Sequence, residues 1–240
     1  KNYIREYVGG DEFINNKIRF CLWLKDADPN IINKSKLIKD RVQKNKEYRL
    51  GSNREATRKL ADLPYLFGEI RQPNTEYLII PKVSSENRKY IPIGLLDSKK
   101  ITNGSALIVP NADLYLFGII TSLMSMVWTK YVGGRLESRY QYSATIVYNN
   151  FPWQENPNET KKEKVEEAAQ KVLDTRKKYP DSSLADLYDP VFMPPDLVKA
   201  HNALDKAVDK CYRSQAFTTE LNRIEFLFDL YEKYIKKLKQ

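Results

Sequence analysis

The pattern of hydrophobic and polar residues changes character near residue 155. Before that point, short runs that alternate or are rich in β-formers predict five strands, at residues 18–24, 77–83, 90–96, 106–109 and 139–148. Pro81, Pro92 and Pro110 restrict the middle three runs to edges, ends or bulges, because proline cannot donate a ladder hydrogen bond. Residues 155–161 are polar and poor in apolar side chains, which is typical of a domain boundary.

Three helices are also predicted before residue 155. The first covers residues 31–50 and ends near Gly51. Its inward side is formed by Ile32, Leu37, Ile38 and Val42. A shorter helix follows at residues 54–63. The third, at residues 114–132, begins with 16 uncharged residues. A bilayer span needs about 20 apolar residues, so a buried core helix is expected rather than contact with a membrane.

Beyond residue 160 the apolar residues recur at helical spacing in three stripes, which begin at Val165, Leu197 and Leu221. Ser183-x-x-Asp186 has the pattern of a capping box before a short helical turn. The whole pattern predicts an α+β protein. Residues 1–154 would form a mixed α/β domain with short strands around a buried helix, and residues 155–240 an all-α region.

The charge of the chain divides at nearly the same place. Residues 1–150 contain 24 Lys and Arg residues against 15 Asp and Glu residues, whereas residues 151–240 contain 16 of each. An excess confined to one part indicates a surface for a polyanion, with nucleic acid as the leading partner. The excess is densest in residues 34–59, where ten cations stand against three acids. The ten are Lys34, Lys36, Lys39, Arg41, Lys44, Lys46, Arg49, Arg54, Arg58 and Lys59. All but Lys59 are taken as candidate contacts to DNA phosphates, with a solvated basic face as the alternative.

No catalytic site can be identified in these residues. The glycine-rich nucleotide motifs and the H-E-x-x-H metal motif are absent. His201 has no neighbouring nucleophile, and Glu159-x-Lys161 is a pattern that a Lys/Glu-rich helix start produces by chance. Asn150-Phe151-Pro152-Trp153 lacks the paired prolines of the N-P-P-[YFW] loop of amino-methylating enzymes. Cys21 and Cys211 lie far apart without metal-ligand neighbours, which favours packing roles in a reducing compartment and no metal site.

Five segments, taken together, resemble one protein family. They are YVGGDEFINNKIRFCLWLKD (Tyr7–Asp26), IPKVSSENRKYIPIG (Ile80–Gly94), YLFGIITSLMSMVWTKYVGGRLESRYQYSATIVYNNFPW (Tyr115–Trp153), SLADLYDP (Ser183–Pro190) and AHNALDKAVDKCY (Ala200–Tyr212). In this order they resemble the C-terminal part of single-chain type IIG (IIL, MmeI-like) restriction–modification enzymes and their adenine-specific DNA methyltransferase relatives.

The resemblance implies a target recognition domain followed by a helical C-terminal region. It places a nuclease domain, an adenine-N6 methyltransferase domain and the S-adenosylmethionine site upstream of Lys1, so this chain would hold no cofactor of its own. The partners would be duplex DNA and the upstream methyltransferase domain, in a cytoplasmic enzyme that flips its target adenine out of the stack. The start at Lys1 without an initiator Met fits a fragment of such a protein.

Base recognition is expected in the strand that follows Gly133–Gly134. Alternate residues of a strand share a face, so four side chains can project together, those of Glu137, Arg139, Gln141 and Ser143. Arg suits the acceptors of guanine, Gln suits adenine, and Glu can accept from the amino group of cytosine. An ion pair with Glu137 or with another surface acid is the alternative role of Arg139.

The resemblance adds five upstream residues to the candidate base contacts: Ser84, Glu86, Arg88, Asn103 and Ser105. The first three could instead shape their own loop, since Ser and Glu often bind turn amides. Two competing functions remain open, a non-enzymatic protein–protein module and an RNA-binding module. The first would use aromatic residues such as Tyr131, Tyr140, Tyr142 and Trp153 as a partner surface, and the second would stack unpaired bases on the same tyrosines.

Overall fold

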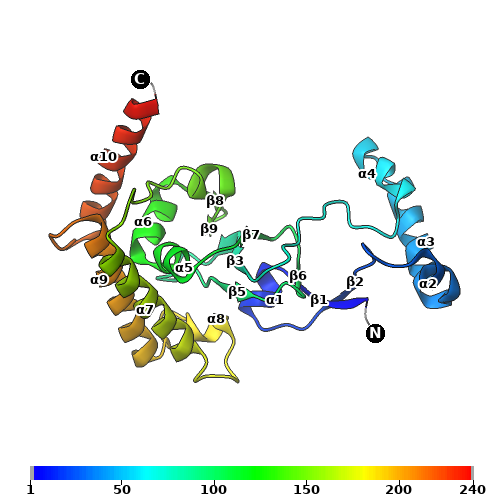
Figure 1. Cartoon of the computed structure of the whole chain (residues 1–240), viewed down its shortest axis with the longest axis horizontal. Coiled ribbons are helices and arrows are strands. Elements are labelled where there is room, and N and C mark those ends of the chain that lie inside the picture. The colour runs from blue at the N-terminus through cyan, green and yellow to red at the C-terminus, as the bar shows by residue number, and fades with distance from the viewer. Residues whose placement is uncertain (1–2, 239–240) are drawn as a thin grey trace.

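The computed structural model describes residues 3–238 and has the predicted α+β architecture. Three small sheets lie in the middle of the molecule (Figure 1). A helical arm made of α2 (Pro29–Lys34), α3 (Lys36–Leu50) and α4 (Glu55–Lys59) stands apart from them at one end. The long helices of the C-terminal part lie at the other end, so the basic residues and the neutral helices are separated along the longest axis.

The sheets are assembled from strands that are distant in sequence. One sheet has the order β2–β1–β6, from Phe20–Leu22, Ile4–Val8 and Ile101–Thr102. A second has the antiparallel order β5–β3–β7, from Gly94–Leu96, Tyr77–Pro81 and Ala106–Pro110. The third has the antiparallel order β4–β9–β8, from Val83–Ser84, Arg139–Gln141 and Gly134–Leu136. β3 is buried along its whole length, which explains its continuous run of apolar residues. The helix α1 (Gly10–Ile14) packs beside it.

The strand predicted at residues 139–148 is only partly correct. β9 ends at Gln141, and residues Ala144–Tyr148 form a helical turn, η2. The Ser143 hydroxyl caps this turn by accepting from the amide of Ile146 at 3.0 Å. The Asn150 side chain donates to the carbonyls of Thr145 and Ile146, at 2.7 and 3.1 Å. These side-chain bonds override the β propensity of a segment rich in β-branched residues.

The buried helix predicted at residues 114–132 is in fact two helices, α5 (Leu114–Thr121) and α6 (Leu123–Val132). Ser122 between them is extended, and its hydroxyl donates to the carbonyl of Ile119 at 2.7 Å. The first amide of α6, that of Leu123, donates to Asp205 Oδ1 at 2.8 Å. A carboxylate from a helix 82 residues away therefore caps α6.

The arm also departs from the single helix predicted at residues 31–50. Ser35 separates α2 from α3, and its hydroxyl accepts from the amide of Ile38 at the start of α3. α4 is followed by a 3₁₀ turn, η1 (Leu60–Asp62). Leu37, expected on the inward side, is exposed. The inward side is instead formed by Ile38, Val42, Asn45 and Arg49, which repeat at helical spacing.

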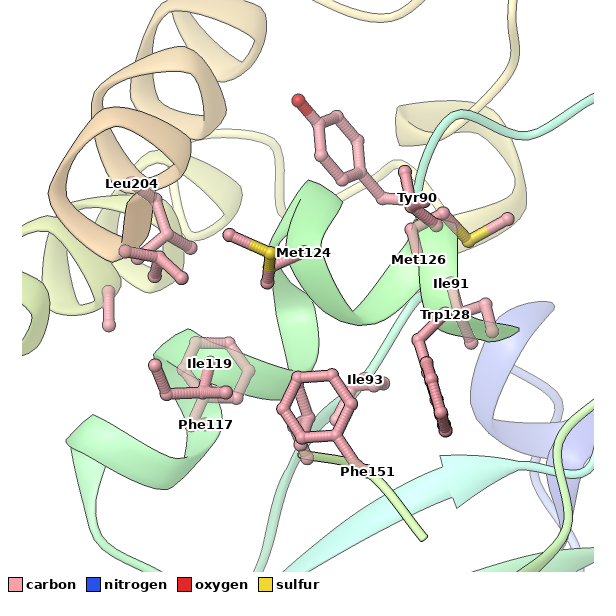
Figure 2. Close-up of a cluster of buried hydrophobic side chains, with 14 of the residues drawn as sticks. Tyr90, Ile91, Ile93, Phe117, Ile119, Met124, Met126, Trp128, Phe151 and Leu204 are labelled. Carbon is pink, nitrogen blue, oxygen red and sulfur yellow. The ribbon is translucent and has the colours of Figure 1, made fainter. Parts of the chain in front are cut away.

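The C-terminal part consists of α7 (Glu159–Arg176), α8 (Leu184–Leu187), α9 (Pro195–Tyr212) and α10 (Glu220–Leu238). The predicted capping box at α8 is confirmed, with the amide and hydroxyl of Ser183 bound to the Asp186 carboxylate. α7 packs closely on α5 at Gly118, where an added Cβ would lie 2.6 Å from the Val165 side chain. One hydrophobic cluster runs from α5 and α6 into these helices, and Figure 2 shows Phe117, Met124 and Leu204 within it. The two parts thus share a core, and a functional division at residue 154 stays a prediction.

Candidate nucleic-acid interface

The cations of the arm form an open, basic surface. Of the ten in residues 34–59, all but Arg49 have exposed side chains. Lys59 pairs with Glu55 at 2.9 Å, and Arg58 donates to the carbonyl of Ser52 at 2.8 Å. Within residues 3–238 the other seven exposed side chains have no ion pair or hydrogen bond: Lys34, Lys36, Lys39, Arg41, Lys44, Lys46 and Arg54. Their charges are therefore available to an external anion.

Arg49 has a different role from its neighbours, which corrects its assignment as a phosphate contact. Its guanidinium is buried and donates to the carbonyl oxygens of Leu60, Leu63 and Leu66, at 2.7, 3.0 and 2.6 Å. Burial lowers the pKa of the guanidinium from its usual value. Arg49 ties α3 to the segment that follows α4, so it holds the arm together instead of facing solvent.

A two-stranded hairpin carries two of the predicted base contacts on one face. β8 and β9 pair through Leu136 with Arg139 and Gly134 with Gln141. Arg139 and Gln141 are exposed, whereas Tyr140 between them is buried. The predicted alternation therefore holds for these two residues. The other two lie elsewhere: Glu137 is in the turn, with φ of 59°, and Ser143 caps η2.

Arg139 does make the ion pair considered as its alternative role. Its Nη2 lies 2.8 Å from Glu137 Oε2, and both side chains are solvent-exposed. Exposed pairs of this kind are worth about 0–1 kcal/mol, so an incoming base edge could replace the partner at little cost. The pair uses one N–H of the guanidinium, and its other four donors have no partner in the described residues.

The loop at residues 84–89 lies against the turn of this hairpin. Ser84 is buried and pairs with Tyr140 across the β4–β9 ladder. Glu86 is exposed and accepts from the Ser138 hydroxyl at 2.7 Å, a bond that lowers the pKa of its carboxyl. Arg88 is half-buried, and burial lowers its pKa. Glu86 and Arg88 also line a cavity of about 200 Å³ together with Tyr140. The structure thus unites two of the predicted sets, although Ser84 itself faces inward.

The third set, Asn103 and Ser105, serves a local network. Asn103 Oδ1 accepts from the amide and hydroxyl of Ser105, at 2.8 and 2.5 Å, and Ser105 Oγ accepts from the amide of Gly10 at 2.9 Å. An added Cβ at Gly9 would lie 2.4 Å from this pair, so the close approach requires glycine. Lys82 joins this loop to the end of β9, because its amide donates to Ser105 and its carbonyl accepts from Tyr142.

Three polar residues beside the hairpin were not predicted from the sequence. The Arg135 guanidinium lies over the Tyr140 ring, 4.1 Å from its centroid, and donates to the carbonyl of Lys130. Lys130 pairs with Glu220 of α10 at 2.6 Å, and Ser138 binds Glu86. Arg135 could have been found if Gly133–Gly134 and the following residues had been interpreted as a hairpin. The contacts of Lys130 with Glu220 and of Ser138 with Glu86 join residues that are 90 and 52 positions apart in the sequence, so no local pattern could predict them.

Residues 3–238 contain no group of three His, Cys, Asp or Glu side chains placed to hold a metal ion. No helix of this part of the chain is long and apolar enough to cross a membrane.

Comparison with known families decides what this arrangement belongs to. Residues 1–155 match the family described as the MmeI target recognition domain, and residues 157–239 match the MmeI C-terminal domain. The chain belongs to the MmeI target recognition domain family. The resemblance inferred from five sequence segments is confirmed.

Two relatives show how much of a longer protein this chain covers. DNA methyltransferase A of Bacillus subtilis (strain 168) is 38% identical over 235 residues, which are 98% of this chain and 26% of that protein. A solved structure of the type IIL restriction-modification enzyme MmeI in complex with DNA is 49% identical, with a TM-score of 0.95 over 98% of this chain and 31% of that one. The chain therefore spans about a quarter to a third of the length of these relatives.

Proposed function

We propose that this chain recognises a base sequence in duplex DNA. The observation that carries the proposal is the β8–β9 hairpin, from which Arg139 and Gln141 project together while Tyr140 anchors it from below. The major groove of B-DNA admits a two-stranded ribbon, and Arg and Gln each have a fitting bidentate partner there, guanine and adenine. Glu137 and Glu86 stand beside them as acceptors for the amino group of cytosine.

The arm supplies the affinity in this proposal. The seven cations that have no partner within residues 3–238 would contact phosphates, which are the same at every base step and carry no sequence information. Because Arg49 holds α3 to the segment that follows α4, the helix that carries most of these cations has a fixed position within the arm, while their side chains stay without partners in the described residues. In this proposal the arm contributes affinity and position on the DNA, and the hairpin contributes recognition of the base sequence.

The similarity to a DNA-bound MmeI supports this assignment and suggests its setting. The longer protein would place its methyltransferase domain upstream, with S-adenosylmethionine bound there and a target adenine flipped towards it. Base recognition by this chain would set which adenine is modified. A reducing, cytoplasmic location suits the two free cysteines, Cys21 and Cys211.

Selection from a pool of randomised duplexes tests the proposal directly. The 240-residue chain should enrich one short sequence, and its affinity should fall steeply as salt rises, through counterion release. A labelled single-stranded RNA competitor distinguishes the RNA-binding alternative. Enrichment of no sequence, binding that ignores salt, or a preference for RNA would each contradict duplex recognition.

A further inference from the structure

The loop at residues 84–89, beside the β8–β9 hairpin, leads into a buried cluster of polar side chains from the C-terminal helices. Tyr90 follows this loop and is almost fully buried (Figure 2). Its ring stacks on the imidazole of His201, with centroids 4.0 Å apart and planes inclined by 23°. Its hydroxyl donates to Asp205 Oδ2 at 2.7 Å. Both partners lie on α9, more than 110 residues away in sequence.

The cluster extends to α7 and to the residue that ends α8. The Tyr188 hydroxyl lies 2.7 Å from His201 Nε2 and accepts from Nε of Arg176 at 2.7 Å. Arg176 Nη1 donates to the carbonyl of Ile93 at 2.6 Å. The segment 90–93 is thus held at both ends, by the side chain of Tyr90 and by the carbonyl of Ile93.

Burial keeps the histidine of this cluster uncharged. Burial and the nearby Arg176 guanidinium keep the pKa of His201 well below its usual value, so the imidazole is neutral. Because the Tyr188 oxygen already accepts from Arg176, we assign its proton to the bond with His201 Nε2. Nδ1 of His201 then carries the ring hydrogen and has no partner in the described residues. A buried polar atom without a hydrogen-bond partner costs free energy, and apolar residues in the same space would avoid this cost. A role beyond packing is therefore needed to explain why these buried residues are polar.

The loop connects the cluster to the hairpin over a short distance. Between Ser84 and Tyr90 it forms a turn in which the amides of Asn87 and Arg88 donate to Ser85, at 3.3 and 3.2 Å. Glu86, at the outer end, holds Ser138 in the hairpin turn. The loop is therefore fixed on three sides: by the β4–β9 ladder, by Ser138 and by Tyr90.

We propose that Tyr90, His201 and Asp205 form a positioning network through which the C-terminal helices set base discrimination by the hairpin. The inference rests on the proposed function. A base-reading side chain discriminates only if it is held within about 0.5 Å of its productive position, because a looser group finds alternative partners. The network acts through the loop and touches no DNA. Its loss should relax sequence preference while leaving phosphate binding by the arm unchanged.

The test compares two buried tyrosines that each lose only a hydroxyl group. Tyr90→Phe removes the bond to Asp205 and keeps the ring on His201. Tyr212→Phe is the matched control, since this hydroxyl, also on a buried ring, donates to the carbonyl of Pro152 and has no link to the loop. In Tyr90→Phe we expect the amides of Asn87 and Arg88 to exchange with deuterium about tenfold faster, as follows from losing a hydrogen bond to a carboxylate.

The same variants are then selected against randomised duplexes. Tyr90→Phe should lower the preference for the best sequence over single mismatches by roughly tenfold, with an unchanged salt slope. Tyr212→Phe should match the wild type in both measurements. The surface variant Ser138→Ala removes the hydrogen bond from the hairpin turn to Glu86 and should also relax the preference. The amides near Tyr90 should stay protected in this variant, because the bond from Tyr90 to Asp205 is intact. Ser138→Ala changes no buried side chain, so the test does not depend on a core variant folding.

The outcomes separate this inference from the proposed function. Unchanged amide exchange in Tyr90→Phe, or equal effects of Tyr90→Phe and Tyr212→Phe, would overturn the network whatever the DNA does. Faster exchange with an unchanged sequence preference would also overturn it, because the cluster would then be structural only. If the wild-type chain itself selects no sequence, the proposed function fails and the role in discrimination fails with it, while the exchange data still decide whether Tyr90 anchors the loop.

Discussion

The arm and the β8–β9 hairpin present polar side chains to solvent in opposite ways. On the arm, seven cations have no partner within the described residues, and one buried arginine holds the helices together. On the hairpin and its loop, Arg139 is paired with Glu137, and Ser138 with Glu86. The loop is further tied to a buried cluster by Tyr90. The arm carries cations whose side chains have no partner in the described residues. On the hairpin and its loop, Arg139, Ser138 and Glu86 are held by hydrogen bonds.

This difference follows from what each region would have to recognise. A phosphate is a strong and nearly isotropic acceptor, so a flexible Lys finds it without precise placement. A base edge presents two or three groups in a plane and rejects a misplaced partner. Rigidity is therefore useful at the hairpin and unnecessary at each cation of the arm. Variants that remove charge from the arm, or fixed hydrogen-bonding groups from the hairpin and its loop, test this difference.

The largest effect is expected at the buried arginine of the arm. Arg49→Met leaves three carbonyl oxygens without donors and should lower the free energy of unfolding of the arm by about 3–5 kcal/mol. Lys46→Met, on the exposed side of the same helix, should change it by less than about 0.5 kcal/mol. Deuterium exchange of α3 measures both. Equal protection of α3 in the two variants would show that Arg49 does not hold the arm.

The next effect concerns the pH dependence of the buried cluster. Burial raises the pKa of Asp205 to about 6, against the bonds from Leu123 and Tyr90 that lower it. A carboxyl whose pKa is higher in the folded state stabilises the fold below its unfolded pKa, and this contribution is lost as pH rises through the folded pKa. Wild type should therefore gain up to about 3 kcal/mol relative to Asp205→Asn as the pH falls from 7 to 4.

Denaturant unfolding of both proteins across this pH range measures the difference. The comparison with Asp205→Asn removes the contributions of groups that both proteins share, including His201, whose low pKa acts in the opposite direction, and Lys89 and Asp209 near the carboxyl. A difference that stays flat, or that grows as the pH rises, would contradict the raised pKa of Asp205.

Changes at the hairpin should act on one base position at a time. Arg139→Ala or Gln141→Ala should cost about 1–3 kcal/mol at a single position of the selected sequence and relax the preference there. Val191→Ala is a control at an exposed position of the loop before α9, outside the hairpin. Retention of the full selected sequence by both hairpin variants would mean that this strand does not read bases.

Local patterns in the sequence were sufficient for much of the fold. The first two C-terminal stripes, the capping box at Ser183 and the alternation around Tyr140 each depend on neighbouring residues, and they are present in the structure. The third stripe is confirmed only in part, because Ile224 and Leu227 are buried whereas Leu221, Phe228 and Leu238 are exposed. The inward position of Arg49 was also accessible, since it continues the helical spacing of Ile38 and Val42. Charge alone favours the exposed side of the helix for Arg49, so periodicity and charge give opposite predictions at this position.

The rest depends on contacts between distant segments. The break at Ser122 depends on Asp205, and the end of β9 depends on Ser143, Asn150 and their bonds to η2. Glu137 and Ser138 are not the residues that mark a tight hairpin turn, so the turn could not be predicted. The pairing of Glu86 with Ser138 spans 52 residues and is decided by tertiary packing.

The smallest effect per residue is expected from the cations of the arm. Lys39, Lys44 and Lys46 are exposed and have no partner in the described residues, so their replacement by Ala should leave stability nearly unchanged. Each lost phosphate contact should flatten the slope of log affinity against log salt by about 0.9, which is roughly half a logarithmic unit of affinity between 50 and 200 mM salt. The selected sequence should stay the same, because phosphates do not differ between bases. A salt titration of the triple variant on the selected and on a scrambled duplex measures both properties.

If the slope is unchanged, these lysines form a solvated face and the arm is not the phosphate-binding surface. If the preferred sequence changes, the division of work between arm and hairpin is wrong.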